Sequence, residues 1–286
     1  MRTLVAPVCA FGFLGAVAFP ATAADCPHNP DALGVARVLE VETAGGPLLG
    51  SLQYDSTLEL GAKEVVLTFD DGPHKINTST VLAALRHECV KATFFVVGNL
   101  ARKYPQMLQQ IADQGHTIGT HSWSHPRNLS RTALATAQRQ IVRGFEAISA
   151  AVEQPIAPFF RFPGLNDSKA LRRYTAQRGY AVFSTDISSD DWLGIGARTI
   201  VHRTMARLKR RGNGMVLLHD TKKATAAAVP LLLQELKRNG FKIVHLVPRH
   251  GYVPDGHPLV AGVSALEDGP ASKPRPVPGY TPVSVR

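Results

Sequence analysis

The chain has 286 residues, of which 44% are hydrophobic, and a formal net charge of +10. This length allows one large core or at most two domains. The basic residues are scattered along predicted helices, as in residues 207–211, and no aromatic-interleaved RNA motif accompanies them. We therefore expect no nucleic-acid partner, and the positive charge favours anionic cell-wall polymers or membrane surfaces.

Residues 1–24 have the pattern of a secretory signal peptide. Arg2 gives a positive start, residues 4–19 form an apolar run, and residues 21–23 (ATA) form a small-x-small cleavage site. The apolar run is short for a membrane span, and prolines interrupt both of its ends. We predict a secreted or periplasmic protein with no transmembrane segment in its mature form.

Three further segments follow in chain order. Residues 25–62 are predicted to be an N-terminal extension, residues 63–248 the main domain, and residues 249–286 a proline-rich, flexible tail. Cys26 and Cys89 remain after signal cleavage, and an oxidising compartment would allow them to form a disulfide. The alternative is that Cys89 is a small buried apolar residue, and the sequence leaves both open.

Within the main domain, strand-like apolar runs alternate with helix-like segments. The predicted strands are residues 65–69, 92–97, 116–119, 157–162, 180–185, 214–219 and 241–247. The predicted helices are residues 78–88, 104–115, 130–153 (with Ser130 as its N-cap), 168–179, 197–212 and 224–240. This alternation predicts an α/β fold of about seven parallel strands, as an incomplete, distorted β/α barrel or an open doubly wound sheet.

In such folds the functional site lies at the carboxyl ends of the strands. Five of the predicted strands deliver ionisable or bulky side chains to that edge. These are Asp70 and Asp71 after the first strand, His121 and His125 after the third, Arg161 after the fourth, Asp191 and Trp192 after the fifth, and His219 after the sixth. Such convergence is difficult to explain by stability alone, so the sequence predicts a catalytic site.

The two histidines and one of the adjacent acids form a candidate metal set. Two imidazoles and a carboxylate suit Zn²⁺ with open positions, and the same triad fits non-heme Fe(II). We expect Asp71, His121 and His125 to bind the cation. Asp70 would then take a proton from the water that the cation activates. The iron alternative is usually built on an all-β jelly roll, which the β/α alternation disfavours.

With these residues at the strand ends, the sequence resembles the polysaccharide deacetylases, also called NodB-homology carbohydrate esterases. The resemblance covers about residues 63–248, which makes this segment the expected catalytic domain. Five motifs that carry it appear in order: TFDDG (68–72), HSWSH (121–125), RFP (161–163), DDW (190–192) and LLH (217–219).

The resemblance implies a divalent metal on a distorted β/α barrel and a role for each matching residue. The metal would be Zn²⁺, with Co²⁺ or Ni²⁺ also compatible, and its ligands Asp71, His121 and His125. Asp70 would be the general base, His219 the general acid, Arg161 and Asp191 their orienting partners, Leu217 the acetyl-methyl pocket, and Trp192 a wall beside it.

Two positions depart from the family pattern. Gly164 stands where the third motif usually has an aromatic residue, so its backbone N–H is kept for the oxyanion while a side-chain wall of the groove is lost. We expect Leu165 to fill part of that space. The fourth motif usually has an acid three residues before the Asp-Trp pair, where this chain has Ser188 and, two residues earlier, Asp186.

Together these features predict a hydrolase that removes N-acetyl groups from N-acetylglucosamine-containing glycan, with release of acetate. Peptidoglycan, chitooligosaccharide and exopolysaccharide all fit as substrates. An O-acetyl esterase acting on a xylan-like glycan is the alternative chemistry. A glycan-binding pseudoenzyme is the alternative without catalysis, and the change at Gly164 is its only support. The sequence sets no oligomeric state.

Overall fold

A computed structural model of the chain describes residues 26–249. The predicted signal peptide (1–24) lies outside the described residues, as does the predicted tail apart from its first residue. Within the described part, none of the helices is long and apolar enough to cross a membrane.

All seven predicted strands are present in one sheet. They are β3 (Glu64–Asp70), β4 (Thr93–Val96), β5 (Thr117–Thr120), β6 (Phe159–Phe160), β7 (Ala181–Phe183), β9 (Gly214–His219) and β10 (Lys242–Pro248). Three short strands join them: β1 (Arg37–Val41), β2 (Leu48–Leu49) and β8 (Ile187–Ser188). The segment predicted as an N-terminal extension contributes two of these strands, β1 and β2, to the sheet.

Every strand pairing in the described residues is parallel. The longest path of neighbours is β1-β10-β3-β4-β5-β6-β7-β2, and β9 lies beside β3 with β8 on its other side. No pairing within residues 26–249 joins the two ends of the path. The sheet is thus not closed, and the predicted distorted, incomplete barrel is confirmed.

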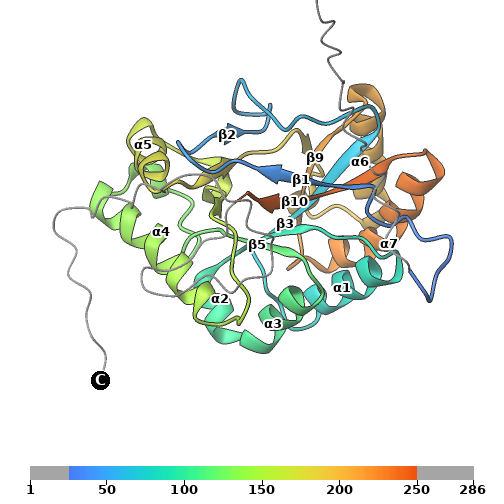
Figure 1. Ribbon diagram of the computed structural model, residues 1–286, viewed down its shortest axis with the longest axis horizontal. Helices are drawn as coiled ribbons and strands as arrows, with labels where there is room; N and C mark the ends of the chain where they lie inside the picture. Colours follow the sequence, from blue (N-terminus) through green and yellow to red (C-terminus); the bar gives the residue numbers. More distant parts are fainter. Residues whose placement is uncertain (1–25, 250–286) are drawn as a thin grey trace, which may run out of the picture.

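Seven helices connect and cover the strands. They are α1 (Asn77–His87), α2 (Gly98–Lys103), α3 (Pro105–Asp113), α4 (Leu134–Ser149), α5 (Lys169–Gln177), α6 (Ala197–Arg211) and α7 (Lys223–Arg238). Figure 1 shows α4, α2, α3, α1 and α7 forming an arc around the strands. Helix α2 is the only one of these that the sequence analysis did not anticipate.

The predicted helix start at Ser130 was wrong. Residues Leu129–Arg131 form a short 3₁₀ turn, and α4 begins only at Leu134, after Ala133. The hydroxyl of Ser130 donates to the side chain of Asn166, 36 residues away, instead of capping a helix. A tertiary contact thus replaces the local one that the residue type predicted.

Alternation along β3 divides the core into two layers. Val65, Leu67 and Phe69 pack in the layer that includes the helices, whereas Val66 packs with Phe95 and other residues of the barrel interior. Because side chains alternate with a period of two, Asp70 at the end of β3 has the same direction as Val66. The last residue of the strand therefore directs its carboxylate into the barrel.

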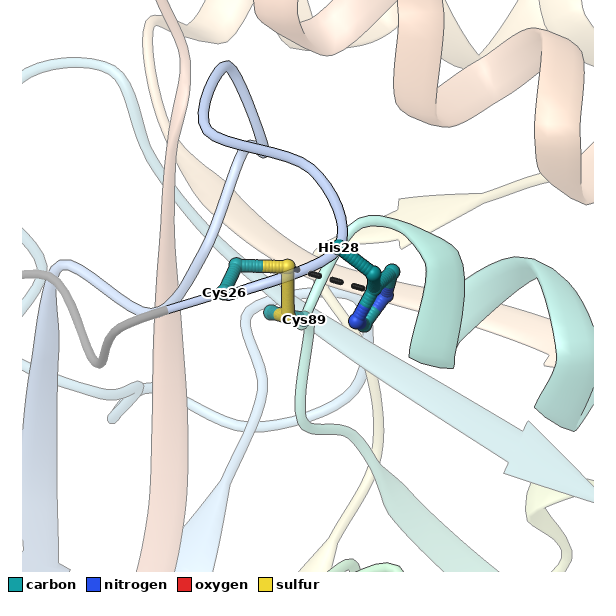
Figure 2. Close-up of side chains that lie close together, drawn as sticks. All are labelled: Cys26, His28 and Cys89. Carbon is teal, nitrogen blue, oxygen red and sulfur yellow. Dashed lines mark hydrogen bonds between the residues drawn. A yellow bond between two sulfur atoms is a disulfide. The ribbon is translucent and has the colours of Figure 1, made fainter.

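The structure forms the disulfide that the sequence left open. Cys26 and Cys89 are bonded, and this bond ties the start of the described chain to the segment after α1 (Figure 2). His28 lies beside it, with Nε2 at 3.7 Å from the sulfur of Cys26. Both sulfurs are used in the disulfide, so neither is available there as a thiolate metal ligand.

We expect removal of this disulfide to destabilise the fold. The bond closes a loop with a sequence separation of 63 residues, and replacing both cysteines by serine should lower the free energy of unfolding by about 2–4 kcal/mol. Urea unfolding followed by circular dichroism measures this. Dithiothreitol should lower the wild-type midpoint and leave that of the serine variant unchanged. Equal midpoints for the two proteins under oxidising conditions would contradict the assignment.

Candidate active site

Two adjacent acids at the end of β3 take opposite directions. Asp70 is the last residue of the strand and is only 2% exposed. Asp71 follows it with a left-handed backbone (φ 74°), which a non-glycine residue rarely adopts and which recurs at functional sites. The reversal separates the two carboxylates, so that one is buried in the barrel and the other lies at its rim.

Asp71 and two histidines converge to form a candidate metal site. Asp71 Oδ1 lies 3.6 Å from His121 Nε2 and 3.2 Å from His125 Nε2. The three potential ligand atoms all lie within 4.8 Å of one another. Asp71 Oδ1 is buried without a hydrogen-bond partner among the described residues. An orphaned carboxylate oxygen facing two imidazole nitrogens fits a divalent cation.

The imidazole of His121 is oriented for metal binding. Its Nδ1 lies 2.7 Å from the carbonyl oxygen of Arg161, which can only accept a hydrogen bond. Nδ1 therefore carries the proton, and the lone pair of Nε2 points at the site. Burial lowers the pKa of His121 to about 3, so the ring is neutral at ordinary pH, as a metal ligand must be. The two histidines lie in the loop after β5 and not on a helix.

A fully buried ion pair holds Asp70. Arg161, which is 0% exposed, donates from Nη1 to Asp70 Oδ1 at 2.6 Å. The guanidinium also donates to Thr68 Oγ1 and to the carbonyl oxygen of Ser184, and it lies over the ring of Phe95. Burial raises the pKa of the Asp70 carboxyl, and the charge of Arg161 opposes this rise. The ion pair uses Oδ1 of Asp70, so Oδ2 does not bond Arg161 and can interact with a molecule in the cavity that Asp70 lines.

His219 lies directly across from Asp70. The β3–β9 register pairs Thr68 with Leu217 and Asp70 with His219, so all four side chains share one face. His219 Nδ1 lies 2.7 Å from Asp191 Oδ1, and the backbone N–H of His219 donates to the other oxygen of that carboxylate. The imidazole thus has one nitrogen fixed by a carboxylate and the other available to a substrate.

The surroundings of His219 favour its protonated form. Burial alone would lower the pKa, but the carboxylate of Asp191, together with Asp70 and Asp71 nearby, raises it to about 9. Burial likewise opposes ionisation of Asp191, but hydrogen bonds from His219 and Thr225 outweigh it and hold the pKa of that carboxyl below its usual range. His219 is therefore a charged proton donor at neutral pH.

One cavity of about 490 Å³ brings these groups together. The metal triad, Asp70 and His219 line it, as do the predicted substrate-contact residues Gly164, Trp192 and Leu217. Trp192 is 49% exposed and meets the His219 ring edge to face at 6.0 Å. Arg161 and Asp191 do not line the cavity, because they lie behind Asp70 and His219. The structure thus assembles all ten residues that the sequence singled out.

Asp220 is a buried group outside the set of predicted site residues. It follows His219, is fully buried, and accepts a short hydrogen bond from Thr78 on α1. Burial raises the pKa of its carboxyl to about 7. A side-chain carbon at Gly72 would overlap this carboxyl, so only glycine allows the turn after Asp71 to approach it. The spacing of the motifs alone does not reveal this contact.

Other residues at the cavity were also missed. Leu52, from the segment before β3, lines it, and Arg127 and Lys222 add positive charge at its rim. Asp186, to which the sequence analysis gave little weight, is buried and accepts hydrogen bonds from Ser51 and Thr57 of that same segment. No sequence pattern links residues this far apart in the chain.

Comparisons with known proteins identify the family to which the chain is similar. A family model described as polysaccharide deacetylase matches residues 58–183. The chain is 30% identical over 203 residues to a chitooligosaccharide deacetylase from Bradyrhizobium sp., covering 66% of this chain and 91% of that protein. It is 33% identical over 198 residues to the Bacillus subtilis peptidoglycan-N-acetylmuramic acid deacetylase PdaC, covering 68% of this chain and 40% of that protein.

A solved structure gives the same result at the level of the fold. The peptidoglycan deacetylase Bd3279 of Bdellovibrio bacteriovorus superposes with a TM-score of 0.67 at 31% sequence identity. The match covers 75% of this chain and 59% of that one. The chain therefore spans only part of some of its relatives and nearly the whole of others.

The geometry of the triad leads to a prediction about metal binding. The wild-type protein should bind one Zn²⁺, and His125→Ala should weaken the affinity by more than the roughly 10–100-fold that loss of an outer-shell partner costs. Isothermal titration calorimetry of the chelator-treated protein measures both. His202→Ala, on an exposed part of α6, is the matched control and should bind as the wild type does. Equal affinities for all three proteins would rule out the triad.

A second prediction concerns protonation of His219. In the metal-free protein its imidazole should titrate with a pKa of about 9. Asp191→Asn removes the charge that raises this value, so the pKa should fall toward or below the ordinary value of about 6.5. NMR titration of the labelled imidazole measures the change. An unchanged pKa in the asparagine variant would show that Asp191 does not set the charge of His219.

Proposed function

The chain belongs to the polysaccharide deacetylase family, and we propose that it is a metal-dependent hydrolase that removes N-acetyl groups from N-acetylglucosamine-containing glycan. The observation that carries this proposal is the placement of Asp70 and His219. They lie opposite each other on neighbouring strands, beside a candidate metal triad, in one cavity. An amide nitrogen is a poor leaving group, so its expulsion needs an acid opposite the base.

Zn²⁺ is the cation we propose, with Co²⁺ or Ni²⁺ as alternatives, held by Asp71, His121 and His125. When bound, it would polarise the acetamide carbonyl and make a water molecule more acidic. Arg161 holds one oxygen of Asp70, which leaves the other to accept the proton of the attacking water. Burial, which raises the pKa of Asp70, makes this carboxylate a stronger base.

The remaining steps use groups on the other side of the cavity. We assign the backbone N–H of Gly164 as a hydrogen-bond donor to the developing oxyanion. His219, charged through its contact with Asp191, donates its proton to the departing nitrogen. Leu217 forms the floor for the acetyl methyl, and Trp192 encloses it from the side. The products are acetate and a glycan with a free amine.

The two alternative functions predict different sites. A glycan-binding pseudoenzyme is expected to lack a base, an acid or a metal ligand, and this chain has all three. An O-acetyl esterase would use the same cation and base, but an alkoxide leaves far more readily than an unprotonated nitrogen anion and needs less help from an acid. The strong Asp191–His219 pair therefore favours the N-acetyl substrate.

We propose that the protein acts outside the cytoplasm, secreted or in a periplasm. The sequence pattern of residues 1–24 and the disulfide between Cys26 and Cys89 both support an oxidising compartment. The relatives are named as deacetylases of peptidoglycan and of chitooligosaccharide, and we propose these two glycans as substrates. Both contain N-acetylated sugars of the kind that the site fits.

Acetate release from N-acetylglucosamine oligomers and from peptidoglycan tests the proposal. Wild-type protein should release acetate, and a chelator should abolish the release until Zn²⁺ is restored. Asp70→Asn should lower kcat by at least about 100-fold, the usual contribution of a general base. Asp113→Asn, at an exposed acid on α3, should have no effect. Zinc-loaded protein that releases no acetate from either glycan would refute the N-deacetylase assignment.

A further inference from the structure

One wall of the cavity is built by a segment that precedes the region matched by the family model. That region begins at residue 58, whereas Leu52 lines the cavity and is 58% exposed. An exposed leucine on a mobile loop would mean little. This one lies in a segment, residues 50–57, that one buried carboxylate holds near both ends and a second holds in the middle.

The first anchor of the 50–57 segment is Asp186. Its carboxylate accepts hydrogen bonds from the backbone N–H of Ser51 at 2.9 Å and from the Ser51 hydroxyl at 2.6 Å. The hydroxyl of Thr57 donates to the same carboxylate at 2.8 Å. Between these contacts, the N–H of Leu52 donates to the carbonyl oxygen of Thr185, at the end of β7. Bonds to a charged acceptor are the stronger kind, so both ends of the segment are held firmly.

The second anchor is Asp167. Its Oδ2 accepts from the hydroxyl of Tyr54 at 2.6 Å and from Nε2 of Gln53 at 3.0 Å. The same Nε2 also donates to the carbonyl oxygen of Leu165 at 2.8 Å. Gln53 therefore ties the segment directly to the turn after β6, where Leu165 lines the cavity beside Gly164. Leu52 is thus held at a defined place relative to that turn.

The turn at Gly164 and Leu165, beside Leu52, leaves part of the cavity wall unfilled. Gly164 and Leu165 both have left-handed backbones, with φ of 61° and 53°. No atom lies within 4 Å of where a side-chain carbon at Gly164 would be. Apolar surface on this side of the cavity comes instead from Leu52 and Leu165. Since the backbone N–H of Gly164 is the proposed oxyanion donor, this wall after β6 borders the reacting centre.

We propose that Leu52 and Leu165 form a sugar-binding subsite, which packs against the apolar C–H face of a pyranose ring next to the ring that is deacetylated. The inference rests on the proposed function and makes it more specific, because it assigns two residues to the recognition of a neighbouring sugar ring. The fixed leucine pair lowers the entropy cost of binding, because the wall is ordered before the glycan arrives.

The test compares Leu52→Ser with wild type on N-acetylglucosamine and its dimer and tetramer. The variant should raise KM for the tetramer about tenfold, as loss of a partly buried leucine contact implies. Its kcat should not change, nor should its activity on the single sugar. Leu52→Met should restore the wild-type KM. Leu134→Ser, at an exposed leucine at the start of α4, is the control and should behave as wild type.

A second readout does not depend on turnover. Titration of the tetramer into chelator-treated protein should show about tenfold weaker binding for Leu52→Ser, with unchanged thermal stability. Equal loss on all substrate lengths, or no loss on any, would overturn the subsite. If wild type releases no acetate but the binding difference persists, the subsite stands and the proposed chemistry fails.

Discussion

The buried ion pair between Asp70 and Arg161 is the interaction on which the site depends. Both charges are almost fully buried, so each is tolerable only with the other in place, and removal of one partner of such a pair typically costs about 3–5 kcal/mol. The side chain of Arg161 orients the proposed base, and its backbone carbonyl orients the metal ligand His121. A single residue after β6 thus fixes the geometry of both halves of the proposed chemistry.

This constraint explains why two acids stand side by side at the end of β3. Asp70 continues the alternation of the strand and points inward to Arg161, whereas Asp71 leaves the strand in a left-handed conformation and faces the histidines. Gly72 then passes so close to Asp220 that a side chain would not fit. Opposite charges and a close backbone approach thus separate two carboxylates that would otherwise repel each other.

Much of the fold and of the candidate site could be predicted from the sequence, because strongly apolar runs and the residues that end them are local features. The seven main strands were predicted in this way, as were eight of the ten candidate site residues, whereas Gly164 and Leu217 came only from the family resemblance. The short strands β1, β2 and β8 were not, since β1 alternates exposed and half-buried residues and the other two have only two residues each. Ser130 was misassigned and Leu52 was missed for a different reason. The partner of Ser130 is Asn166, and Leu52 is placed by the bonds of its neighbours to Asp186 and Asp167, all of them distant in sequence.

The pairing of β1 with β10 has a consequence for how the chain reaches this fold. The two strands join the beginning and the end of the described residues, and the ion pair beside them links Glu42 to Arg249 across 207 positions. Contacts between such distant segments slow folding, because the chain must close a very long loop before it gains them. β1 therefore has no strand partner until almost all of the described chain has been synthesised, because β10 is the last strand to be made. During that interval an unpaired strand edge is open to other chains, so this edge is where we expect aggregation of newly made protein to begin.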